Sequence, residues 1–132
     1  MTRSTLLSHS PLAYESTLRV ASATHPGVAF TVYRMSFGRR TELTTSIREM
    51  SRKGEFLEAG NDFAEQVEAN LLACEIEKMY LRWGLVSIEG LTIDGEAASV
   101  DLLIDRGPED LAKEIVTAVR AQCGLSEEER KN

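Results

Sequence analysis

The fold is decided by the stretch from residue 61 to residue 84, NDFAEQVEANLLACEIEKMYLRWG. Asn61 or Asp62 can cap the start of a helix, and Gly84 is a typical helix terminator. Between them, apolar residues recur at helical spacing in two lines. The first line contains Phe63, Val67, Leu71 and Cys74, and the second contains Leu72, Ile76, Met79, Tyr80 and Trp83. A helix that is apolar over such a wide arc is predicted to form the spine of a domain.

Further helices are predicted on both sides of this spine. Upstream, Ser36 can cap a helix that stops near Gly54, with a short separate segment at residues 55–59. Its apolar side chains, at spacings of four and three, are Leu43, Ile47 and Met50. Downstream, Ser99 can cap a brief helix, and Pro108 suits the first turn of the next one. That helix is predicted to bury Leu111, Ile115, Val116, Val119 and Cys123, and residues 125–129 have the capping-box pattern of one last turn.

Strands are predicted in two places. Residues 16–20 and 27–35 are rich in β-branched and aromatic side chains, and residues 23–27 between them supply a turn, so a two-stranded ribbon is expected. Residues 85–98 alternate between apolar and polar, with turns at Gly90 and at Asp94-Gly95, which indicates a short strand or loop hairpin. A two-stranded ribbon is marginal alone and must lie on the helices. The predicted fold is therefore mainly α with a small β element (α+β), an N-terminal ribbon packed on a bundle of about four helices.

Composition and charge limit the classes of function. Residues 1–14 are rich in Ser and Thr and are expected to form a mobile arm, while residues 15–132 are long enough for a single helix-rich domain. No apolar run approaches the roughly 20 residues needed to span a bilayer, so a cytoplasmic protein with no membrane partner is expected. Residues 1–60 carry a net charge of +3 and residues 61–132 a net charge of −9, which together give the −6 of the chain. The acidic second half repels nucleic-acid phosphates and can attract a basic protein surface.

Residues that could perform catalysis are few. The only histidines, His9 and His25, lie in the predicted arm and first turn, where a rigid catalytic geometry is hard to hold. The two cysteines, Cys74 and Cys123, are far apart in sequence and are expected to be buried free thiols. The sequence therefore predicts no catalytic, cofactor-binding or metal site, and the chain is not expected to be an enzyme.

A basic cluster leaves a nucleic-acid alternative open. Its members are Arg34, Arg39, Arg40, Arg48, Arg52 and Lys53. Glutamates are interleaved with these side chains and no aromatic platform accompanies them, so an internal match to the acidic half is at least as good an explanation. A regulator that binds nucleic acid through this cluster remains an alternative, although nucleic acid is not the partner expected.

Several short blocks, in order along residues 27–132, resemble the tail assembly chaperones of long-tailed bacteriophages and prophages. The blocks are FTVYRMSFGRR at residues 30–40, WGLV at 83–86, IDG at 93–95, GPEDL at 107–111 and GLSEEERKN at 124–132. The resemblance implies a small protein of the bacterial host cytoplasm that is not usually part of the finished virion. It also implies that the protein holds the tape measure protein while tail tube subunits polymerise around it.

Binding to a long helical partner requires an apolar groove or helix face. Leu72, Met79, Tyr80 and Trp83 are the predicted protein-binding surface, because Trp and Tyr are favoured interface anchors and Met adapts to varied partners. All four could instead belong to the core of a domain of this size. The expected partners are the tape measure protein and the tail tube protein, and a homo-oligomer is left open. A small structural connector or completion protein of the particle is the other protein-binding alternative.

Overall fold

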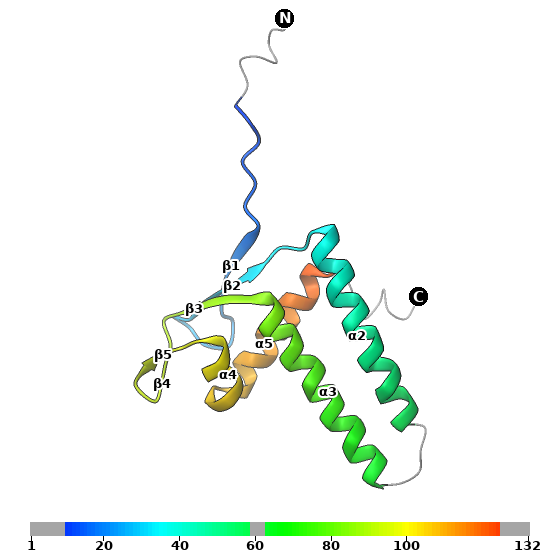
Figure 1. Cartoon of the computed structure of the whole chain (residues 1–132). Coiled ribbons are helices and arrows are strands. Elements are labelled where there is room, and N and C mark those ends of the chain that lie inside the picture. Colours follow the sequence, from blue (N-terminus) through cyan, green and yellow to red (C-terminus); the bar gives the residue numbers. More distant parts are fainter. Residues whose placement is uncertain (1–9, 59–62, 125–132) are drawn as a thin grey trace, which may run out of the picture.

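The computed structural model describes residues 10–58 and 63–124, and for residues 53–58 it describes the backbone alone. Four helices and a small antiparallel sheet make up these residues. The helices are α2 (Phe37–Glu58), α3 (Phe63–Gly84), α4 (Val100–Arg106) and α5 (Glu109–Gln122). The strands are β1 (Thr17–Ala21), β2 (Ala29–Tyr33), β3 (Leu85–Glu89), β4 (Thr92–Ile93) and β5 (Glu96–Ala97). The predicted α+β class, with an N-terminal β element followed by helices, is confirmed. Residues 10–15 are exposed and form neither helix nor strand, and Figure 1 shows them running away from the body.

The sheet has three strands in the order β1-β2-β3, so the two-stranded ribbon predicted for the N-terminus was incomplete. β1 pairs antiparallel with β2, with Thr17 opposite Tyr33, and β3 pairs antiparallel with the other edge of β2. The register shifts between Thr31 and Val32, which face Ser87 and Leu85, so Val86 is the extra residue of a bulge. The bulge turns Val86 outward while Leu85 is buried. β4 and β5 form the short hairpin predicted around Asp94-Gly95.

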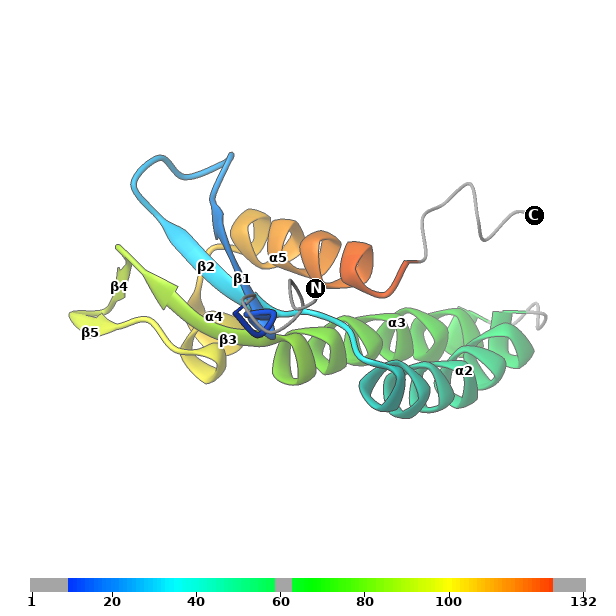
Figure 2. The same ribbon diagram turned by 90° about the horizontal axis from the view of Figure 1, so that it is seen from above.

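The long helices α2 and α3 form an antiparallel hairpin. Figures 1 and 2 show them side by side in one layer, with α5 in a second layer behind α3 and with the far end of the hairpin extending beyond the other elements. Ser36 caps α2 as predicted, because its Oγ accepts a hydrogen bond from the Arg39 N–H at 3.2 Å. The predicted stop at Gly54 and separate segment after it were wrong, since α2 continues to Glu58. One glycine costs a helix only about 1 kcal/mol, which packing along α3 can offset. The predicted caps at Asn61 or Asp62 and the last turn at residues 125–129 lie outside the described residues.

The core lies where the sheet meets α3, α4 and α5. Its largest fully buried side chains come from several elements: Phe30, Val32, Leu43, Leu103, Leu111, Ile115 and Val119. The buried face predicted for α5 is confirmed, including Cys123 just after its end. Ser99 caps α4 as predicted, with its Oγ accepting from the Leu102 N–H at 3.2 Å. The core therefore supports only the C-terminal half of α3, and this determines which apolar residues of that helix reach solvent.

Candidate protein-binding site

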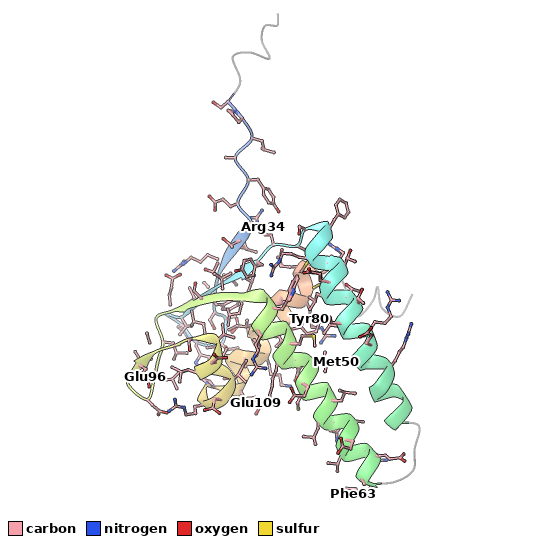
Figure 3. All side chains as sticks on the ribbon, in the orientation of Figure 1. Arg34, Met50, Phe63, Tyr80, Glu96 and Glu109 are labelled. Atoms are coloured by element: carbon pink, nitrogen blue, oxygen red, sulfur yellow. The ribbon has the colours of Figure 1, made fainter. Side chains whose placement is uncertain are left out.

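The four residues predicted to bind a partner differ in burial and in the hollow that they border. Tyr80 is buried, with 6% of its surface exposed, while Leu72, Met79 and Trp83 are half-buried. Met79 and Trp83 border a shallow hollow between α2 and α3 that also contains Met50. Tyr80 instead lines a groove where α5 passes the hairpin (Figure 3). The structure therefore does not bring the four together as one exposed surface.

An exposed apolar line occupies the other predicted face of α3. Phe63, Val67 and Leu71 are 77%, 40% and 56% exposed, and Cys74 continues the line one turn further and is also exposed. Figure 3 places Phe63 at the far end of the hairpin. The prediction that Cys74 is buried was wrong, because Cys74 lies at the middle of α3, before the last turns of the helix where Tyr80, Leu81 and Gly84 are buried. We call Phe63, Val67, Leu71 and Cys74 the α3 stripe.

The groove beside Tyr80 has three helical walls and a volume of about 560 Å³. α2, α3 and α5 contribute its lining residues: Thr44, Ile47, Arg48, Ser51, Ala73, Ile76, Glu77, Tyr80, Lys113 and Arg120. Ile47, Ile76 and Tyr80 supply apolar surface, and charged side chains from all three helices border it. We call this hollow the α2/α3/α5 groove. Its volume lies within the range of roughly 300–1,000 Å³ that ligand sites occupy.

The charges around the groove are partly paired. Lys113 Nζ lies 2.7 Å from Glu77 Oε1, and this hydrogen bond with Glu77 is the main reason that the pKa of Lys113 is raised. The Arg120 guanidinium lies 5.5 Å from the centre of the Tyr80 ring. Among the described residues, neither Arg48 nor Arg120 has a carboxylate within ion-pair distance. Within the described part of the chain, the groove therefore carries two positive charges that no carboxylate neutralises at ion-pair distance.

Two members of the basic cluster are used inside the fold. Arg39 lies between the rings of Tyr33 and Trp83, with its guanidinium carbon 4.0 Å from each ring centre, and its Nη2 donates to the Trp83 carbonyl at 2.8 Å. Arg40 Nη1 donates to the Cys123 carbonyl. Each arginine thus satisfies a carbonyl at the negative end of a helix, α3 for Arg39 and the end of α5 for Arg40. The cluster is therefore not a single free positive surface.

Carboxylates of α5 hold the turn between β1 and β2. Glu114 accepts hydrogen bonds, each of 2.7 Å, from the Ser22 hydroxyl, the Ala23 N–H and the Thr24 hydroxyl. Partial burial pushes the pKa of Glu114 upward, but these hydrogen bonds outweigh burial and leave the pKa lowered. His25 Nε2 lies 2.9 Å from Asp110 Oδ1, and this hydrogen bond is the main reason that the pKa of Asp110 is lowered. The His25–Asp110 pair is partly exposed at the surface and joins the β1–β2 turn to α5.

The described part of the chain contains no group of three or more His, Cys, Asp and Glu that could hold a metal ion. Cys123 is buried, and burial raises the pKa of its thiol. Within the described residues, no helix is long and apolar enough to cross a membrane.

Comparisons with protein-family models, curated proteins and solved structures found no match for the chain. The resemblance to tail assembly chaperones therefore depends on the short sequence blocks alone.

Proposed function

We propose that this chain is a phage tail assembly chaperone that binds the tape measure protein, and also tail tube subunits, in the cytoplasm of the bacterial host. It releases them as the tail forms and is absent from the finished virion. The single observation that carries the proposal is the α3 stripe. The sequence blocks that resemble the chaperone family give the class of partner.

The α3 stripe has the geometry of a helix-binding surface. Phe63, Val67 and Leu71 recur every four residues, so they stand one above another on one side of α3. Such a row packs against the apolar face of a second helix, and tape measure proteins are long helical rods. Burial of each large apolar side chain contributes roughly 1.5–3 kcal/mol before the costs of association are subtracted. Three such side chains support a reversible complex, as a chaperone that releases its partner requires.

Binding by the stripe is tested with the tape measure protein that the proposal expects to be encoded near the gene for this chain. Both are produced together in bacteria, and the complex is isolated on a tag carried by the tape measure protein. We expect wild-type chain to co-purify, and the double variant Phe63→Ser and Leu71→Ser to be depleted at least tenfold. Phe37→Ser is the matched control, because Phe37 is 93% exposed on α2 and lies outside the stripe. Equal recovery of the stripe variant and wild type would show that the stripe is not the binding surface.

A proximity measurement gives an independent readout. Cys74 is exposed within the stripe and Cys123 is buried, so a maleimide fluorophore should label Cys74 selectively, with Cys74→Ser as the control for selectivity. We expect the spectrum of the fluorophore to shift to the blue when the tape measure protein covers the stripe. If no tape measure protein is encoded near this gene, the proposal fails. Stoichiometric presence of the chain in purified virions would instead support a structural connector.

A further inference from the structure

The α2/α3/α5 groove is separate from the α3 stripe and has a different chemical character. Val67 at the middle of the stripe and Tyr80 in the groove are thirteen positions apart, which places them about 140° apart around the axis of α3. The stripe is apolar, whereas the groove combines apolar side chains with arginines from two helices. A ligand of the groove must therefore satisfy both kinds of surface.

The walls of the groove favour a helical ligand. Every wall is a helix, and the backbone groups within these walls are bonded inside their own helices. An extended peptide would find no strand edge there to pair with its own backbone groups. A helix brings its backbone already bonded, and only its side chains need partners. The lining residues of α2 span two turns, from Thr44 to Ser51, or about 10 Å of wall.

The charges of the groove favour an acidic ligand. Among the described residues, the lining contains Arg48, Lys113 and Arg120 against Glu77, and Glu77 already pairs with Lys113. Arg48 and Arg120 remain for the carboxylates of a partner. The chain as a whole has a net charge of −6, so this local excess of two positive charges runs against the average of the molecule. A basic helix would meet Arg48 and Arg120 without compensation, which disfavours it.

We propose that the α2/α3/α5 groove binds an amphipathic helix of a partner protein whose apolar residues lie on Ile47, Ile76 and Tyr80 and whose Asp or Glu side chains pair with Arg48 and Arg120. This proposal goes beyond the chaperone function, because it holds for any partner with such a helix. It specifies the chemistry of the occupant: an apolar row flanked by carboxylates.

The probe is a fluorescein-labelled designed peptide of about 18 residues, helical, with Leu in an i, i+4 row and Glu on both sides of that row. Its counterpart has Lys at every Glu position. Binding to the full chain is measured by fluorescence anisotropy. We expect the Glu peptide to bind at least tenfold more tightly than the Lys peptide and to lose affinity as salt is raised. Equal affinity for the two peptides would overturn the proposal.

Variants of the chain test whether the peptide binds in the groove. Arg48→Gln and Arg120→Gln are each expected to weaken binding of the Glu peptide about threefold to tenfold. Ala73→Trp introduces a bulky ring at an exposed lining position and should abolish binding without removing any attractive contact. Arg82→Gln is the matched control, because Arg82 is an exposed arginine of α3 outside the groove lining. Unchanged affinity in Arg48→Gln and Ala73→Trp, both at exposed positions, would refute the groove as the site even if Arg120→Gln alters the packing of Tyr80.

Sedimentation distinguishes a helix of a partner protein from a second copy of this chain as the occupant of the groove. We expect the unliganded chain to sediment identically with and without Ala73→Trp. A dimer that Ala73→Trp converts to monomer would show that a second copy fills the groove, and would overturn the proposal. None of these measurements contains the tape measure protein, so failure of the chaperone function and failure of the groove proposal are distinguishable.

Discussion

Replacement of Gly84 by Ala tests how closely α3 and α5 approach each other. Gly84 is buried at the end of α3, and a Cβ atom there would lie 2.4 Å from Val119 Cγ1 and 2.8 Å from Val119 Cγ2 on α5. An ordinary contact for such an atom begins at 3.4 Å, so one of the two helices must move by about 1 Å. Val119 is 1% exposed and cannot simply rotate, because a valine in a helix has one strongly preferred rotamer.

The cost of this clash can be estimated. Overpacking of a core costs about 1–3 kcal/mol, and a contact this short against a side chain this rigid belongs near the upper end. Ala is better than Gly in a helix interior by up to about 1 kcal/mol, an advantage that is smaller at the last residue of α3. The net loss from these two effects is about 2 kcal/mol. With an unfolding entropy of about 2.1 cal/mol/K for each of the 132 residues, Tm should fall by about 7 °C.

A double-mutant cycle with Val119→Ala shows whether the clash is the cause. Val119→Ala alone removes two buried methyl groups and should cost about 2 kcal/mol. In the double variant the methyl group added at position 84 enters the space that the valine left, and the nearest remaining atom is the Cβ of residue 119 at 3.2 Å. Urea titration should therefore find the double variant about as stable as either single variant. Additivity of the two losses within about 0.5 kcal/mol would refute this account of the helix contact.

Three further outcomes are expected. Arg39→Gln should lower the free energy of unfolding by about 2–3 kcal/mol, because a charged hydrogen bond and two ring contacts are lost. Urea unfolding can be measured by the fluorescence of Trp83, the sole tryptophan, and an unchanged urea midpoint would contradict this expectation. Glu114 has a folded pKa below its ordinary value of 4.5, so its stabilisation is present above that pH and is lost as the pH falls through the folded pKa. The stability difference between wild type and Glu114→Gln should therefore shrink as the pH is lowered below 4.5, and a difference that stays constant would be inconsistent with it. Ser99→Ala should cost about 1 kcal/mol by removing the cap of α4, and a thermal melt identical to that of wild type would argue against the cap.

Features that depend on local sequence were predictable. Apolar residues at spacings of three and four predicted the buried face of α5, and Leu111, Ile115 and Val119 are buried as that pattern indicates. The cap at Ser99 depends on groups within one turn of the helix, so its residue type was informative. The third strand was harder, because pairing of β3 with β2 joins residues more than fifty positions apart. Nothing in the alternation of residues 85–89 says which strand lies beside them.

The candidate site was less predictable, because exposure depends on what packs against a helix. Both apolar lines of α3 look alike in sequence, yet Tyr80 is buried and Phe63 is 77% exposed. One signal was available: α3 has 22 residues and α5 has 14, or about 33 Å against about 21 Å. A helix this much longer than its neighbour must extend beyond it, and the N-terminal half of α3 does so. No comparable signal in the sequence shows which members of the basic cluster are used inside the fold, since only the fold shows that Arg39 donates a hydrogen bond to the Trp83 carbonyl at the end of α3.

The stripe and the groove together determine how a partner can engage this chain. Val67 at the middle of the stripe and Tyr80 in the groove lie about 140° apart around α3, so one straight helix cannot contact both of these side chains at once. Simultaneous occupancy requires two helical segments, and if these belong to one partner the second contact forms at a high effective concentration. Two weak contacts then hold a long helical protein firmly while either one can release alone. A partner held in this way dissociates stepwise and keeps one contact while the other opens, which one tight site does not allow.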